Sequence, residues 1–426
     1  MNQQVEKQAL IAQITQLRTA MLDARAAGRE AAAEHYAGVC ADLGARSLSS
    51  TAALRFRLRT DLLISTAYRD PPDLDVRLRE LADECRRVFG PVHRTTLYAR
   101  RAHIPQVVKA GRPLQAERVA DELAQDAIRL LGREHPEARL ARQIHALMLA
   151  GIGRCDEALV AVDALGLSRA AARRPAAAAG PQDAVVQDEP SEAEAAIAEA
   201  AAATDEVRLT VMGIRGWWPQ VDTVLAGRIE RLLRRLGPHH PDYLKAIILR
   251  ARALASAGDP ETALELSAQG SDGLVEQRGF EALANFEAYI VQSRALQSLD
   301  DPVQAETAAR YTLDQAATRW GGAHTVSAAA SVALASALIT QSRPAEALPL
   351  AESAAAAYRA GHGDAHPGWL NGRFTAAEAL AGLGRATEAR ATHQAILADR
   401  VRILGEEHPD TRSSYRALAV QPPDAS

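Results

Sequence analysis

Histidines recur in this 426-residue chain at spacings that invite a chemical explanation. His324, His366 and His408 follow one another at intervals of 42 residues. Imidazole can ligate zinc, act as a base or cap a helix. A metal centre needs several ligands about 2 Å from one ion, whereas a fixed interval places each histidine on a different structural unit. We therefore expect these histidines to be helix N-caps or loop-packing residues, and no metal site.

Other residues that could do chemistry give no catalytic pattern. The three cysteines, Cys40, Cys85 and Cys155, are far apart and form no CxxC pair. Such sparse thiols suit a reducing compartment and small buried positions. None of the three lysines precedes Ser or Thr, so the P-loop motif is absent. Adjacent acids are best explained as exposed neighbours on helices. We expect no catalytic residue, no cofactor and no enzymatic activity.

The histidine interval is shared by other residues, which defines a repeated unit. His93 and His135 are also 42 residues apart, and His240 precedes His324 by twice that interval. A turn-forming residue follows each of five histidines by 18 positions: Gly111, Gly153, Gly258, Ser342 and Gly384. An alanine comes five positions later: Ala116, Ala158, Ala263, Ala347 and Ala389. The copy at Ala282 lacks the histidine but keeps Asp300 and Ala305 at the same offsets.

Each unit has the pattern of two helices. Proline after the histidine, as in His240-Pro241, suits the first helical position, where its missing N–H is not needed. Pairs such as Ala253-Leu254 and Ala295-Leu296 recur at one place and suit close helix packing. Pro260 and Pro302 then start the second helix. The sequence therefore predicts a helical hairpin repeated in register.

This pattern resembles tetratricopeptide (TPR) repeats of the 42-residue, kinesin light chain-like type that is common in actinobacterial proteins. The resemblance covers nearly the whole chain. It implies an all-α, right-handed helical-hairpin solenoid, which we count as about nine hairpins and a C-terminal capping helix near residues 410–418. The recurring loop, as in "LGEEHPD" at residues 404–410, then joins one hairpin to the next.

The interval is broken once, because His135 and His240 are separated by two periods and 21 further residues. The excess falls in an Ala-, Pro- and acid-rich stretch with few large apolar residues. We therefore predict an N-terminal helical-repeat block at 1–167, a flexible linker at 168–190 and a C-terminal TPR block at 191–426. The two blocks could stack or hinge.

Binding is the function that this architecture favours, because hairpin solenoids present a concave surface lined by the first helix of each unit. Residues 51–142 carry 18 Lys and Arg against 13 Asp and Glu, although the whole chain has a net charge of −4. Arginine binds carboxylates and phosphates through paired donors. The candidate binding residues are Arg59, Arg100, Arg101, Arg139, Arg142, Trp217, Trp218, Arg252, Arg294 and Asn371.

Asparagines on the first helices often hold extended peptides in the family that this chain resembles, but here a full series is missing. The chain has only Asn2, Asn285 and Asn371, which favours docking led by charge or shape. We expect a cytoplasmic, non-enzymatic scaffold that binds an acidic protein or peptide, with no nucleic-acid or membrane partner. The alternative is a peptide- or ligand-sensing regulator that switches when the two blocks move relative to each other.

Overall fold

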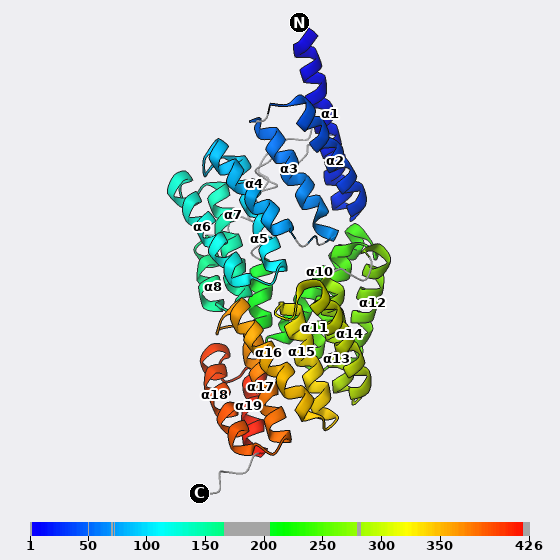
Figure 1. Cartoon of the computed structure of the whole chain (residues 1–426), viewed down its shortest axis with the longest axis vertical. Helices are drawn as coiled ribbons and strands as arrows, with labels where there is room; N and C mark the ends of the chain where they lie inside the picture. Colours follow the sequence, from blue (N-terminus) through cyan, green and yellow to red (C-terminus); the bar gives the residue numbers. More distant parts are fainter. Residues whose placement is uncertain are drawn as a thin grey trace, which may run out of the picture.

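The computed structural model describes residues 2–49, 51–69, 71, 73–165, 205–278 and 283–420. These residues form helices joined by short turns, with no strand among them. The helices stack along one long axis, and the first and last helices lie at opposite ends of the molecule (Figure 1). The part of the chain that the structure describes therefore confirms the predicted all-α hairpin solenoid.

The N-terminal helices are α1 (Asn2–Ala26), α2 (Glu30–Ser47), α3 (Ala53–Thr66), α4 (Leu74–Phe89), α5 (Arg94–Lys109), α6 (Pro113–Leu131), α7 (Pro136–Gly151) and α8 (Cys155–Asp163), with a 3-10 turn at Ala67–Arg69. Residues 205–214 are also helical. The C-terminal helices are α10 (Trp218–Leu236), α11 (Pro241–Ala257), α12 (Pro260–Arg278), α13 (Leu283–Ser298), α14 (Pro302–Trp320), α15 (Thr325–Thr340), α16 (Pro344–His362), α17 (Pro367–Gly382), α18 (Ala386–Leu404) and α19 (Pro409–Val420).

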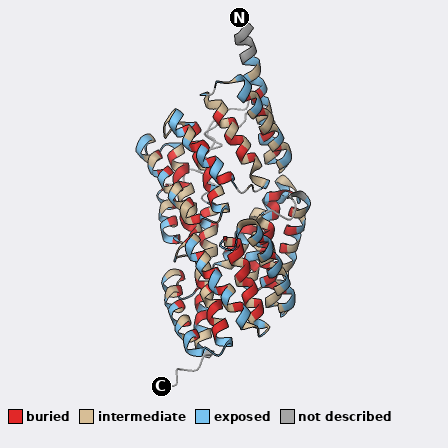
Figure 2. Cartoon of the chain, in the orientation of Figure 1, coloured by how far each residue is buried: buried red, intermediate tan, exposed pale blue. Residues whose placement is uncertain are grey.

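Consecutive helices pack in pairs, and the first helices of successive hairpins also pack on one another. Such contacts join α11 to α13, α13 to α15 and α15 to α17. The buried residues lie along the faces where the helices meet (Figure 2), and many of them are alanines. On α15, for example, Ala330, Ala335 and Ala337 have no exposed surface. Alanine lets helix backbones approach closely, so this composition permits two neighbours for each first helix.

The turn within each hairpin has the backbone conformation that its sequence requires. Gly111 and Gly153 have φ of 74° and 87°, a region that L-residues with side chains avoid. Asp300 and Ser342 replace glycine at this position and still adopt φ of 62° and 59°. They are the only non-glycine residues with positive φ among those described. The 42-residue interval therefore marks a position with positive φ, which is usually glycine but keeps this φ when it is Asp or Ser.

The repeated histidines are N-caps, as predicted. In all six loops the Nδ1 atom accepts a hydrogen bond from the backbone N–H two residues later, at 3.0–3.2 Å. An N-cap satisfies one of the otherwise unpaired donors of the first helical turn. A glycine with positive φ precedes each histidine by three residues: Gly90, Gly132, Gly237, Gly321, Gly363 and Gly405.

The predicted linker at residues 168–190 lies outside the described residues, so the division into two blocks and a linker remains a prediction. None of the described helices is both long enough and apolar enough to cross a membrane.

Candidate functional site

A seam joins hairpins that are about five repeats apart in the chain. The Nε2 atom of His240 lies 3.0 Å from the carbonyl oxygen of Ala26, and that of His324 lies 2.8 Å from the carbonyl oxygen of Lys109. His408 makes the equivalent contact with Ile214 at 3.1 Å. Because a carbonyl only accepts and the backbone N–H already donates to Nδ1, the ring proton must lie on Nε2. Each of these neutral imidazoles therefore caps its own helix and holds a distant one.

Glycine at the seam is required by space as well as by φ. A Cβ atom on Gly111 would lie 2.7 Å from Cδ2 of His324, and one on Gly216 would lie 2.7 Å from Cδ of Pro409. A Cβ on Gly153 would collide with the carbonyl of Ala365, in the loop that precedes His366. The glycine turns of the early hairpins thus receive the histidine loops of the later ones.

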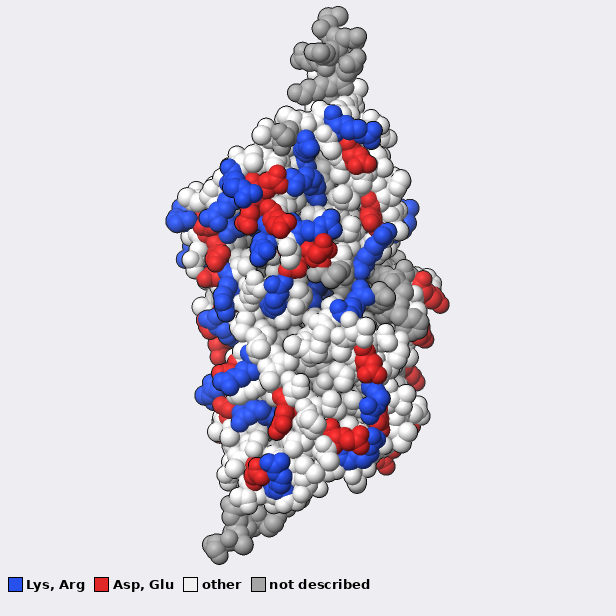
Figure 3. All heavy atoms as spheres, in the orientation of Figure 1, with Lys and Arg blue, Asp and Glu red and all other residues white. Residues whose placement is uncertain are grey.

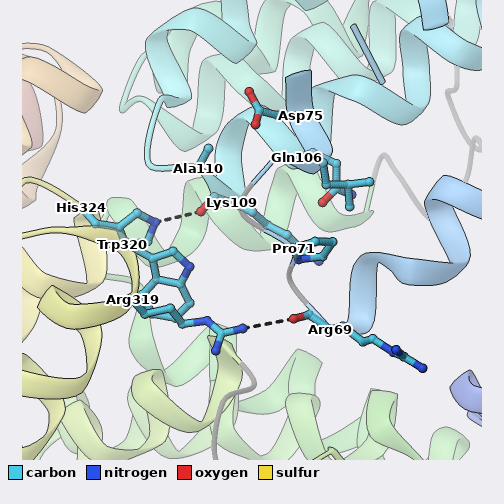
Figure 4. A pocket seen from close by; sticks show the side chains of 10 residues that line it. Arg69, Pro71, Asp75, Gln106, Lys109, Ala110, Arg319, Trp320 and His324 are labelled. Carbon is cyan, nitrogen blue, oxygen red and sulfur yellow. Dashed lines mark hydrogen bonds between the residues drawn. The ribbon is translucent and has the colours of Figure 1, made fainter. Parts of the chain in front are cut away.

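Figure 4 shows this seam near His324, where a pocket of about 420 Å³ separates the two sets of hairpins. His324 points to the carbonyl of Lys109, and Arg319 donates to the carbonyl of Arg69 at 3.1 Å. The Trp320 ring stacks on His324 with 4.8 Å between centroids. Of the charged side chains here, Arg319 bonds across the seam, while those of Arg69, Asp75 and Lys109 bond within the N-terminal hairpins. The charges of this pocket therefore have partners in the chain, and we interpret the pocket as a structural joint.

A larger pocket, of about 670 Å³, lies in the concave interior of the C-terminal hairpins. The first helices α11, α13, α17 and α19 contribute to it, together with residues 206–214, α10, Tyr358 of α16 and Gly151 at the end of α7. Its wall also includes His366 and His408, two of the repeated loop histidines. A concave volume of this size is typical of a ligand site. This concave pocket is the candidate functional site.

Two arginines present their charge to the concave pocket. Arg252 and Arg294 both line it, and both side chains keep exposed surface. Desolvation by the surrounding protein lowers the pKa of Arg294; the like charge of Arg252 adds to this shift, while Asp410 and Tyr358 oppose it. Burial raises the pKa of Tyr358 to about 12, so its hydroxyl stays protonated. The pocket therefore holds positive charge that the surrounding protein disfavours.

Asn371 is positioned in the pocket by a buried arginine. Arg400 is 2% exposed and donates to Oδ1 of Asn371 at 2.7 Å, to Ser414 at 2.8 Å and to the backbone oxygen of Asp410 at 2.7 Å. It also lies over the ring of Phe374, 4.5 Å from the centroid. Sequence reasoning missed Arg400, because nothing in its position marks it as a contact between α17, α18 and α19.

The N-terminal arginine candidates already have partners within the chain. Arg59 pairs with Glu84 at 2.8 Å, Arg100 with Asp126 at 2.9 Å and Arg101 with Glu137 at 3.2 Å. Arg139 and Arg142 donate to the backbone oxygens of Leu165 and Ala164. Figure 3 shows acidic and basic side chains intermixed over the N-terminal half of this face. A net basic count thus does not amount to free basic charge, and we leave these five residues out of the site.

A recurring spacing could have revealed one of those pairs. Arg100 and Asp126 are 26 residues apart, as are Arg373 and Asp399, which pair at 3.1 Å. In both cases the arginine is on a first helix and the acid on the second helix of the same hairpin.

The two adjacent tryptophans have different surroundings. Trp218 packs with Leu209, Val221 and Leu225 and lines the concave pocket. Trp217 is 49% exposed at the start of α10 and is not part of the pocket wall. The structure therefore brings Trp218, Arg252, Arg294 and Asn371 together and leaves Trp217 apart.

The thiols have no features of reactive groups. All three cysteines are buried. Burial raises the pKa of Cys85 and of Cys155 to about 11 and also raises that of Cys40. A thiol in such surroundings is a poor nucleophile. Within the described parts of the chain, no three His, Cys, Asp or Glu side chains are grouped as metal ligands would be.

Comparison with known proteins yields structural neighbours alone. No family model and no curated protein sequence matches the chain. Kinesin light chain TPR-like repeats of Podosopora anserina are similar over 46% of this chain and 92% of theirs, with 20% identity and a TM-score of 0.35. Rap protein complexed with competence and sporulation factor is similar over 67% of this chain and 88% of its own, with 10% identity and a TM-score of 0.38.

These superpositions are too weak to carry an argument about function. The evidence for the fold is in the chain itself, in its 42-residue hairpins, its turns with positive φ and its stacked first helices. By that geometry the described part of the chain has the fold of a TPR-like solenoid of helical hairpins.

Proposed function

We propose that the chain is a non-enzymatic binding scaffold whose concave pocket receives a segment of a protein or peptide. The observation that supports this most is the pocket of about 670 Å³ lined by the first helices α11, α13, α17 and α19, with Trp218, Tyr358 and several polar side chains in its wall. Binding sites combine such concavity with a few placed polar groups. The buried thiols with raised pKa argue against nucleophilic chemistry by cysteine.

A pocket-filling variant tests this proposal. Ser256 lines the pocket, whereas Ser298, 42 residues later, is exposed and lies outside it. Random heptapeptides are selected against the wild-type chain and then measured by fluorescence anisotropy. Ser256→Trp should weaken the selected peptides at least tenfold, and Ser298→Trp should leave their affinity unchanged. Equal affinities in the three proteins, or a selection that yields no peptide, would reject the concave pocket as the binding site.

The alternative, a ligand-sensing regulator, is favoured by one specific observation. The pocket wall includes Gly151 of α7, in the predicted N-terminal block, beside residues of the predicted C-terminal block such as Arg252 and Asn371. A ligand in the pocket would therefore contact groups of both blocks. Small-angle scattering of the chain with and without a selected peptide tests this function. A change in the radius of gyration on binding supports the regulator, and an unchanged radius leaves the rigid scaffold.

A further inference from the structure

Arg252 and Arg294 occupy the same place in consecutive repeats. They are 42 residues apart, on the first helices α11 and α13, which pack directly against each other. Both side chains are exposed to the concave pocket. The charge of Arg252 affects the pKa of Arg294, and both arginines affect the pKa of Tyr358. The three groups therefore interact electrostatically.

Among the described residues, the guanidinium groups of Arg252 and Arg294 form no hydrogen bond or salt bridge, although their backbone oxygens accept bonds from Ser256 and Ser298. This distinguishes them from arginines elsewhere, such as Arg250, which bonds to Asp222 at 2.7 Å, and Arg343, which bonds to Glu306 at 2.8 Å. Two acids lie in the neighbourhood, Glu287 on α13 and Asp410 on α19, and both interact with the arginines only through space.

Those two acids do not cancel the positive charge. Burial raises the pKa of Glu287, which disfavours its negatively charged form. At Arg294, burial and the charge of Arg252 lower the pKa by more than Asp410 raises it. Arg416 adds a third cation to the wall, while Glu206 is bonded to Arg228 at 2.8 Å. The unsatisfied charge in the pocket is therefore positive.

The neutral groups of the pocket are also donors. A guanidinium can only donate, so Oδ1 of Asn371 must face Arg400, and the amide nitrogen is left as the free donor of Asn371. The Tyr358 hydroxyl keeps its proton, since burial raises its pKa. Two arginines, an amide and a phenol are complementary to an acceptor with several oxygen atoms.

We propose that Arg252 and Arg294 bind an oxyanion, a carboxylate or a phosphate, carried by a small ligand or by the end of a peptide that enters the concave pocket. This inference rests on the proposed function, because it names the chemical group that the pocket recognises. Asn371 and Tyr358 orient the oxyanion. A site of about 670 Å³ holds a small ligand or a short chain segment, and a folded domain is too large for it.

The test uses the full chain at about 0.05 M salt, because charge pairs with partial exposure are screened at higher ionic strength. Calorimetric titrations use inorganic phosphate and two tripeptides, acetyl-trialanine with a free C-terminal carboxylate and the same peptide with a C-terminal amide. The variants are Arg252→Gln and Arg294→Gln. Arg235→Gln is the matched control, because Arg235 is an exposed arginine of α10 outside the pocket wall.

Saturable binding of phosphate or of the free-acid peptide is expected, with dissociation constants at least tenfold higher in both pocket variants and unchanged in Arg235→Gln. Phosphate binding alone identifies a phosphorylated ligand, and free-acid binding with at least tenfold weaker amide binding identifies a chain end. Absence of saturable binding to the wild type, or equal binding to all four proteins, overturns the proposal. If the selected heptapeptides still bind the wild type and bind Ser256→Trp at least tenfold more weakly in that case, the proposed function stands although the oxyanion proposal fails.

Discussion

Replacing His324 by asparagine should separate the two bonds that this imidazole makes. Asparagine is as good an N-cap as any residue, so the bond to the N–H of Val326 can be replaced. Its side chain is too short to reach the carbonyl of Lys109, 2.8 Å from Nε2 in the native protein. Losing that bond at a side chain that is 5% exposed should cost about 1–2 kcal/mol. Losing the stack on Trp320 adds about 0.5–1 kcal/mol.

His135 provides the control, because it caps α7 in the same way but is exposed and has no distant carbonyl partner among the described residues. His135→Asn should therefore change the free energy of unfolding by less than about 0.5 kcal/mol. His324→Ala removes the cap as well and should cost about 1 kcal/mol more than His324→Asn.

The assay is hydrogen–deuterium exchange followed by mass spectrometry, supported by urea unfolding. Exchange is preferred because long repeat arrays do not unfold in a single step. In His324→Asn, amides at the C-terminal turn of α5 should exchange about tenfold or more faster, since these residues lose their partner across the seam. If the amides of α5 exchange at the same rate in His324→Asn and His135→Asn, the seam bond does not stabilise α5 and the reasoning is refuted.

Three further outcomes are expected. Gly153→Ala should lower the free energy of unfolding by about 3 kcal/mol or more, because φ is 87° there and the new Cβ would meet the carbonyl of Ala365. Gly384→Ala should cost about 1 kcal/mol, because φ is 78° but the space around it is open. Equal costs of the two variants in thermal unfolding would contradict the seam. Burial lowers the pKa of His362 to about 4, so the neutral imidazole contributes its full stability above pH 6.5. As the pH falls towards 4, protonation should lower the free energy of unfolding by about 3 kcal/mol. His362→Leu should make the free energy of urea unfolding less dependent on pH in this range. Cys85 and Cys155 should react with a thiol reagent at pH 8 only after denaturant is added, and fast reaction of the native chain would show that they are accessible.

Much of the fold could be predicted from the sequence, because each feature of a repeat depends on residues close to one another in the chain. The turn at Asp300 illustrates this, since its offset within the repeat predicted a turn and its φ of 62° confirmed it. The histidine cap is equally local, as it joins atoms only two residues apart. The inward position of Arg252 and Arg294 followed from their place on the first helices.

The seam could not be predicted in this way. Whether His324 reaches the carbonyl of Lys109 depends on the path of all the hairpins between them, and small changes in each packing angle accumulate along a solenoid. Ion pairs between neighbouring helices are missed for a different reason. The net charge of residues 51–142 counts every charged residue, whether or not it is paired, so it does not reveal that Arg100 already pairs with Asp126 at 2.9 Å. Unpaired charges can be identified only from the contacts of each residue.

The seam and the concave pocket are parts of one structure, because they share His408. Its ring caps α19, bonds to Ile214 across the seam and contributes to the pocket wall. Asp410, two residues later, donates its backbone N–H to that ring and accepts a bond from Arg400, which in turn positions Asn371. A ligand anion at Arg294 would act on the Asp410 carboxylate, and through it on the start of α19. The start of α19 is therefore a place where occupancy of the pocket and the seam bond of His408 would influence each other.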